Sequence, residues 1–178
     1  MTILIPTNSL VVMIGVSGSG KSTFAKQNFS ATEIVSSDFC RALICDDEND
    51  QSVNQEAFEL LHWLVEKRLA LGKLTVVDAT NVKAASRQPL LALAKSYNVP
   101  AIAIVLNFDL EFCLQQNSQR THRVVPPTII AEQLQELRAS LPELTSEGFQ
   151  SVYKLVSPKE FDGLRIVQSV ESIESLES

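Results

Sequence analysis

The sequence predicts an α/β fold in which a parallel sheet is flanked by helices. Four strand-like runs occupy residues 10–14, 33–37, 74–77 and 101–106. The first run, LVVMI, is continuously apolar, which is typical of a strand buried on both faces of a sheet. Segments with helical periodicity separate the runs, and strands that alternate with helices in this way form parallel sheets with right-handed crossovers.

The helical segments are recognised by their apolar spacing. Helix signals begin soon after the first strand, and a longer helix is expected from Val53 up to a glycine stop at Gly72. Residues 84–97 form another candidate, in which Pro89 marks either a kink or a later start. Two further helical stretches flank a basic loop, which predicts a helix-loop-helix lid over about residues 109–140.

The residues beyond the lid offer two more strand-like runs, 151–156 and 164–167. The last residues, 171–178, read ESIESLES and are expected to form an acidic tail or a linker. A chain of 178 residues fits one domain, which we place at residues 1–170.

The composition is that of a soluble globular protein, with 45% hydrophobic and 20% charged residues. No apolar run approaches the length of a membrane span and the first residues do not resemble a secretory signal, so we expect a cytoplasmic protein. The three cysteines form no C-x-x-C pair, which argues against a disulfide framework or a zinc ribbon. A net charge of -6 excludes the broad basic surface that binds long duplexes.

Residues 15–22, GVSGSGKS, match the phosphate-loop pattern G-x-x-x-x-G-K-[ST] after a buried strand and before a helix. Its glycines allow backbone N–H groups to converge on phosphate oxygens, and the helix N-terminus adds positive potential. Lys21 would reach the β- and γ-phosphates of ATP, and the Ser22 hydroxyl would bind Mg²⁺. The chain lacks the N-K-x-D and D-x-x-G strings of a GTPase, so we expect an ATP-dependent phosphotransferase with a P-loop kinase fold.

A transferase also needs a base that activates the acceptor. Asp38 follows the second strand and would lie at the carboxyl edge of the sheet, where it could accept the proton of an attacking hydroxyl. Arg41 would share its side of a helix and could orient the carboxylate or bind an acceptor phosphate. The alternative is that Asp38 only caps a helix.

Two further groups could complete the site. Asp78 ends the third strand, where an acid contacts Mg²⁺ or its waters, and Thr80 and Asn81 could reach the acceptor. Alternatively, Asp78 only holds neighbouring loops through hydrogen bonds. Arg120 and Arg123 lie in the basic loop of the lid and would clamp the γ-phosphate when the lid closes, unless this loop is simply solvated.

Together these segments resemble the 5′-hydroxyl polynucleotide kinase domain of the bacterial polynucleotide kinase-phosphatase-ligase, an RNA repair enzyme. The similarity takes in the phosphate loop, SSDFCR, DDENDQ, KRLALGKLTVVDATNV and RTHR, in this order. It implies ATP and Mg²⁺ as cofactors and single-stranded RNA or DNA ends with a 5′-hydroxyl as acceptors. It also implies a homodimer built from elements of both termini, here residues 1–5 and the strands after Ser151.

The resemblance also assigns roles by position. It makes Asp38 the base on the 5′-hydroxyl and Ser22 the protein's Mg²⁺ ligand, with Gln116 standing where the family often has a basic residue. The catalytic residues would be Lys21, Asp38, Arg41, Arg120 and Arg123. The nucleotide would be held by Arg120, Arg123, Gly15, Ser17, Gly18, Ser19, Gly20, Lys21, Ser22 and Thr23.

Two other classes of function remain open. A kinase of a small-molecule hydroxyl, on a sugar, nucleoside or antibiotic, would share the loop, the aspartate and the lid, but would have less use for Arg41. A regulatory module that only binds ATP would not need Asp38. Because the family enzyme continues into phosphatase and ligase domains, the chain is expected to be either an excised domain or a stand-alone relative.

Overall fold

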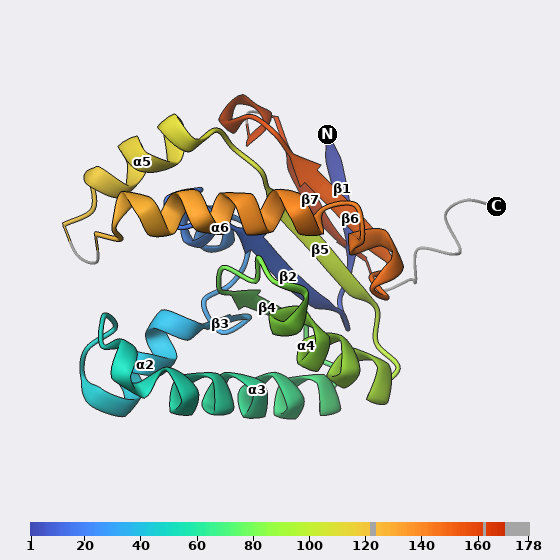
Figure 1. Cartoon of the computed structure of the whole chain (residues 1–178). Coiled ribbons are helices and arrows are strands. Elements are labelled where there is room, and N and C mark those ends of the chain that lie inside the picture. Colours follow the sequence, from blue (N-terminus) through green and yellow to red (C-terminus); the bar gives the residue numbers. More distant parts are fainter. Residues whose placement is uncertain (122–123, 162, 170–178) are drawn as a thin grey trace.

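The computed structural model describes residues 1–121, 124–161 and 163–169. Its centre is a five-stranded, wholly parallel sheet with the strand order β3-β4-β2-β5-β6 (Figure 1). The strands are β2 (Leu10–Gly15), β3 (Ile34–Ser36), β4 (Thr75–Asp78), β5 (Ala101–Leu106) and β6 (Ser151–Leu155). This sheet confirms the predicted α/β fold.

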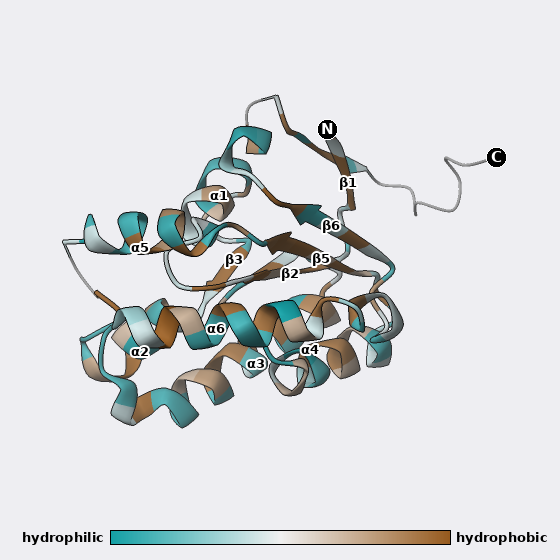
Figure 2. Cartoon of the chain, turned by 45° about the horizontal axis from the view of Figure 1, so that its top comes forward, coloured by the Kyte–Doolittle hydropathy of each residue, from teal (hydrophilic) through white to brown (hydrophobic). Residues whose placement is uncertain are grey.

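Helices cover both faces of the sheet. Figure 2 shows α1 on one side of the strands and α3, α4 and α6 on the other. The helices are α1 (Lys21–Asn28), α2 (Ser37–Cys45), α3 (Asn54–Ala70), α4 (Ala84–Ser96), α5 (Leu110–Ser118) and α6 (Pro127–Ser140). Short 3₁₀ turns occur at Gln51–Val53, Leu144–Ser146 and Pro158–Phe161. Within the described part of the chain, no helix is long and apolar enough to cross a membrane.

The core explains why these residues form these elements. Every residue of β2, β4 and β5 is buried, as expected for the three inner strands of a sheet covered on both faces. On α3 the buried residues recur every four positions, at Ala57, Leu61, Val65 and Leu69. Figure 2 shows the same pattern, with hydrophobic strands in the middle and hydrophilic outer faces on the helices.

Most boundaries shift by one or two residues from the expectations, and two of the differences bear on the site. Helix α4 begins at Ala84 and carries Pro89 inside it, so the later start, one of the two alternatives for Pro89, is wrong. The strand expected at 33–37 ends at Ser36, because Ser37 already belongs to α2. The tail at 171–178 lies outside the described residues.

The two ends of the described chain form a second, two-stranded sheet. Strand β1 (Thr2–Pro6) pairs in parallel with β7 (Arg165–Ser169), with Ile3 opposite Ile166. Ile3 and Ile5 are fully buried, which anchors β1 to the core beside β6 (Figure 1). The terminal segments that the resemblance assigns to a dimer therefore pair with each other inside one chain.

Candidate active site

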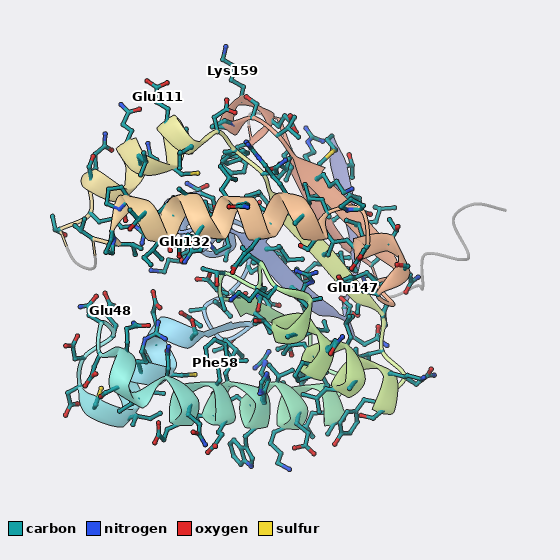
Figure 3. All side chains as sticks on the ribbon, viewed as in Figure 1. Glu48, Phe58, Glu111, Glu132, Glu147 and Lys159 are labelled. Atoms are coloured by element: carbon teal, nitrogen blue, oxygen red, sulfur yellow. The ribbon has the colours of Figure 1, made fainter. Side chains whose placement is uncertain are left out.

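A cavity of about 240 Å³ lies where the carboxyl ends of β2, β3 and β4 meet. The phosphate loop follows β2, α2 follows β3, and Asp78 ends β4 opposite Ser36 of the neighbouring strand. In Figure 3, Phe58 of α3 points towards these strand ends. The lining residues are Ser17, Lys21, Ser22, Ser37, Asp38, Arg41, Gln51, Asn54, Phe58, Asp78, Ala79, Thr80, Arg120 and Gln133.

The phosphate loop has the backbone shape that its glycines permit. Gly18 and Gly20 take φ values of 83° and 92°, a region that other residues rarely adopt. At Gly18 there is also no room for a side chain, because a Cβ atom would lie 2.2 Å from the carbonyl oxygen of Cys113 in α5. Helix α5 therefore packs directly on the phosphate loop.

Lys21 is the buried cation of the site. Its Nζ donates to the Val16 carbonyl at 2.8 Å and approaches the Ser19 hydroxyl at 3.5 Å. Burial lowers the pKa of the Lys21 amine to about 8; the nearby Asp78 partly offsets this effect, and Arg120 adds to it. An anion bound beside Lys21 would stabilise its charged form.

Asp38 lies in the first turn of α2 and is paired with Arg41. The N-cap of this helix is Ser36, whose side chain accepts from the Phe39 N–H, so the interpretation of Asp38 as a cap is wrong. The Arg41 guanidinium donates to Asp38 and also to the Glu48 carbonyl at 2.9 Å and Asn54 Oδ1 at 2.7 Å.

The two partners of this ion pair differ in exposure. The Arg41 side chain is 3% exposed and that of Asp38 is 38% exposed. Arg41 is thus held inside the protein by several acceptors and fixes the Asp38 carboxylate at the cavity wall. Two roles were considered for Arg41, orienting the Asp38 carboxylate or binding an acceptor phosphate. The buried guanidinium fits the first role better than the second.

The loop after β4 supports the phosphate loop. Asp78 is buried and lines the cavity together with Ser22, and the Gly15 N–H donates to the Thr80 carbonyl at 3.0 Å. Asn81 has φ 48° and its side-chain amide donates to the Met13 carbonyl at 2.9 Å. The expectation that Asn81 reaches the acceptor is therefore wrong, because its side chain is buried against β2.

A buried ion pair between α4 and Glu147 supports the loop after β4 through hydrogen bonds to its backbone. Arg87 of α4 is fully buried, pairs with Glu147 at 2.5 Å and donates to the carbonyls of Asn81 and Val82 at 2.8 Å and 2.9 Å. Removing either partner would leave an uncompensated charge in the core. This support could not be predicted from the sequence, because 60 residues separate Arg87 from Glu147.

The predicted lid includes the helices α5 and α6, which lie above α2 in Figure 1, and Gln133 of α6 lines the same cavity as Asp38 of α2. Arg120 follows α5, is exposed, and lines the cavity. Asn117 closes the segment between the two helices with two hydrogen bonds, donating to the Val125 carbonyl at 2.8 Å and accepting from its N–H at 3.0 Å. Gln116 is half-buried on α5, and Arg123 lies outside the described residues.

Two residues of the lid helices were missed by the sequence analysis. Asn117 is buried, and Gln133 of α6 accepts a hydrogen bond from the Ser17 N–H of the phosphate loop at 2.9 Å. Neither belongs to a known short motif. A buried polar residue on an amphipathic helix is the signal that could have pointed to Asn117, whereas Gln133 gives no comparable signal.

A second cavity, of about 650 Å³, adjoins the first, and its lining includes the exposed residues Thr23, Lys26 and Phe39. The two cavities share Ser22, Asp38, Asp78 and Arg120. The outer walls of the second are Thr23, Lys26, Ala31, Ile34, Ser36, Phe39, Glu48, Gln119 and Thr121. In Figure 3, Glu48 lies at the outer end of the gap between α2 and α6. No group of three or more His, Cys, Asp or Glu side chains among the described residues could hold a metal ion.

Comparison with known proteins places the chain in a family. A model of an AAA domain family, AAA_33, matches residues 10–144. The chain belongs to this family. The match begins with β2 and ends beyond α6, so it includes the phosphate loop, Asp38 and both lid helices. A search of curated proteins gave no significant sequence match.

Several solved structures share the fold of this chain at low sequence identity. A chain of the Pnkp1/Rnl/Hen1 RNA repair complex is 20% identical with a TM-score of 0.66, over 79% of this chain and 47% of that chain. An AvrRxo1-ORF1:-ORF2 complex with ATP is 13% identical with a TM-score of 0.67, over 88% of this chain and 56% of that chain.

A sugar kinase from Janibacter sp. HTCC2649 is 21% identical with a TM-score of 0.57, over 86% of this chain and 88% of that chain. The AAA_33 chain thus spans about half the length of the first two relatives and most of the third. These likenesses show a P-loop kinase fold, whose phosphate loop implies nucleotide binding.

Proposed function

We propose that this AAA_33 protein transfers the γ-phosphate of ATP to the 5′-hydroxyl end of RNA or DNA. One observation carries the proposal: Asp38, fixed by the buried Arg41, lies where two cavities join. The first cavity holds Lys21 and Ser22 of the phosphate loop, and the second leads past Lys26 to the surface. A donor and an end of a chain can therefore approach Asp38 from two directions.

The transfer step follows from these positions. Asp38 accepts the proton of the acceptor hydroxyl, whose oxygen attacks the γ-phosphorus as the bond from that phosphorus to the bridging oxygen of ADP breaks. Lys21 and Arg120 neutralise the charge on the transferring group, and Arg123 is proposed to join them. General base action contributes about 10²- to 10⁴-fold in rate, and an arginine at the γ-phosphate about 10³- to 10⁵-fold.

Ser22 and Asp78 fit a magnesium ion. Both offer oxygen atoms to the same cavity, the ligand type that Mg²⁺ prefers, and two protein oxygens leave the remaining positions to phosphate oxygens and water. Bound there, Mg²⁺ would neutralise phosphate charge during transfer. We propose Ser22 as a direct ligand and Asp78 as a contact to the ion or its waters.

The second cavity favours a chain end over a small molecule. A small substrate is usually held in an enclosed pocket that buries most of its surface. Here the wall beyond Asp38 includes Lys26, suited to a phosphate, and the exposed ring of Phe39, suited to a base. A small-molecule kinase remains the second candidate, and the fold shared with a sugar kinase supports it.

The decisive experiment offers both acceptor classes at once. The protein is incubated with γ-labelled ATP, Mg²⁺, a 5′-hydroxyl oligoribonucleotide, the matching oligodeoxyribonucleotide and a panel of sugars, nucleosides and aminoglycosides. We expect label on the oligonucleotides, and none when their 5′ ends already carry phosphate. Label only on small molecules would refute the proposed acceptor, and no transfer to any acceptor while ATP binds would favour a regulatory module.

The biological setting is also part of the proposal. We propose a cytoplasmic protein that heals nucleic-acid ends for repair and that works as a homodimer, in its native setting beside phosphatase and ligase activities. The basis is the sequence resemblance, together with the RNA repair complex among the structural neighbours. Light scattering during size-exclusion chromatography tests the dimer, and a monomer mass at about micromolar concentration would contradict it.

A further inference from the structure

The side chain of Gln133 connects α6 to the phosphate loop. Its Oε1 accepts from the backbone N–H of Ser17 at 2.9 Å, although 116 residues separate the two along the chain. Ser17 is buried, Gln133 is half-buried, and both line the cavity that contains Lys21, Ser22 and Arg120. The contact therefore joins the second lid helix to the part of the loop that faces the cavity.

The chemistry of this contact fixes the orientation of the carboxamide. A backbone N–H can only donate, so the oxygen of Gln133 must face Ser17 and its NH₂ group must face elsewhere. Within the described residues, this NH₂ group donates to no protein atom. Gln133 therefore brings a pair of donors without a protein acceptor among the described residues to a cavity that is also lined by the cations Lys21, Arg41 and Arg120.

We infer that Gln133 recognises the γ-phosphate of the nucleotide. With its oxygen on the Ser17 N–H, its NH₂ group donates to a γ-phosphate oxygen beside Lys21. The residue thereby couples the position of α6 to the presence of a third phosphate. This inference rests on ATP as the donor of the proposed function and is independent of the acceptor.

The test compares triphosphate and diphosphate binding in the absence of any acceptor. The probes are the β,γ-imido analogue of ATP and ADP, each with Mg²⁺, measured by titration calorimetry on the full chain. Gln133→Glu keeps an oxygen for the Ser17 N–H but replaces the NH₂ donors with negative charge. We expect it to weaken binding of the triphosphate at least about tenfold, and to change ADP binding by less than about twofold.

Two variants make the result interpretable. Gln133→Ala removes both halves of the carboxamide and should weaken triphosphate binding about three- to tenfold, again with little effect on ADP. Gln135→Glu places the same charge on the exposed side of the same helix and should change neither affinity. It controls for the general effect of an added negative charge on nucleotide binding.

Three outcomes would overturn the inference. Unchanged triphosphate affinity in Gln133→Glu would show that the NH₂ group does not contact the nucleotide. Equal losses for ADP and the triphosphate would show that Gln133 only shapes the loop. A selective loss that Gln135→Glu reproduces would assign the effect to charge alone. The proposed acceptor would instead be refuted if the wild-type protein bound both nucleotides but phosphorylated neither the RNA nor the DNA oligonucleotide, so the two failures are distinguishable.

Discussion

At the scale of single residues, burial sets the charge state of the site. Lys21 is the group whose ionisation matters most, since its pKa is lowered to about 8, mainly by burial, in the nucleotide-free protein. A bound phosphate stabilises the ammonium form and raises this pKa. Nucleotide binding is therefore coupled to proton uptake at the pH values where the free amine is partly neutral.

The coupling predicts a pH dependence of nucleotide affinity. Because the pKa of Lys21 is higher in the complex than in the free protein, affinity is complete below about pH 8 and decreases above it, by up to about tenfold per pH unit. Calorimetry with ADP between about pH 7 and 9.5, in buffers of different protonation enthalpy, measures the proton uptake. Lys21→Met should bind weakly at every pH; the same slope in that variant would contradict the assignment to Lys21.

Asp38 and Arg41 make the second prediction at this scale. Asp38→Asn has nearly the same shape and can still accept from Arg41, but cannot act as a base. We expect phosphoryl transfer to fall about 10²- to 10⁴-fold while ATP affinity changes less than about threefold. Single-turnover rates and ATP titrations measure the two quantities separately. A parallel loss of ATP affinity would mean that Asp38 serves the nucleotide and not the acceptor.

At the scale of elements, the lid segment depends on Asn117. The two hydrogen bonds from this buried side chain to Val125 hold the chain between α5 and α6, from which Arg120 reaches the cavity. Asn117→Ala leaves the Val125 amide and carbonyl without these partners. We expect a loss of about 1–3 kcal/mol in stability and a fall in the transfer rate, because Arg120 is held less firmly.

Thermal melting and transfer kinetics measure these two effects. Ser118→Ala is the matched control, since the neighbouring hydroxyl is exposed and, among the residues that the structure describes, bonds only to the Gln115 carbonyl in its own helix. Unaltered kinetics in Asn117→Ala, with only a lowered melting temperature, would show that the segment keeps its position without this residue.

Elements were predictable from the sequence where the signal is local. The continuous apolar runs predicted β2 and β5, because a strand buried on both faces needs apolar residues at successive positions. The glycine spacing and Lys21 predicted the phosphate loop, because the shape of this loop depends on residues that are neighbours in the sequence. Asn81 was misassigned since its left-handed backbone turns the amide back to Met13, a direction that the residue order does not reveal. Gln133 was missed because its contact with Ser17 exists only after α6 packs on the sheet.

At the scale of the whole molecule, the net charge of -6 limits how nucleic acid can be bound. The cations that line the two cavities, Lys21, Lys26, Arg41 and Arg120, lie close to the site, so we expect contact with only a few phosphates of a short single-stranded end. For single strands the logarithm of the binding constant decreases by about 0.7 per phosphate neutralised for each unit in log salt. Titrating a fluorescent 5′-hydroxyl oligonucleotide across a range of salt should therefore give a shallow slope. A slope that corresponds to more than about five phosphates would contradict this localised mode of binding and indicate a basic surface that the sequence does not provide.

The Lys26→Ala variant tests whether the nucleic-acid strand lies in the second cavity. If it does, the number of neutralised phosphates calculated from the salt slope should fall by about one. Lys95→Ala, on α4 away from both cavities, should leave the slope unchanged.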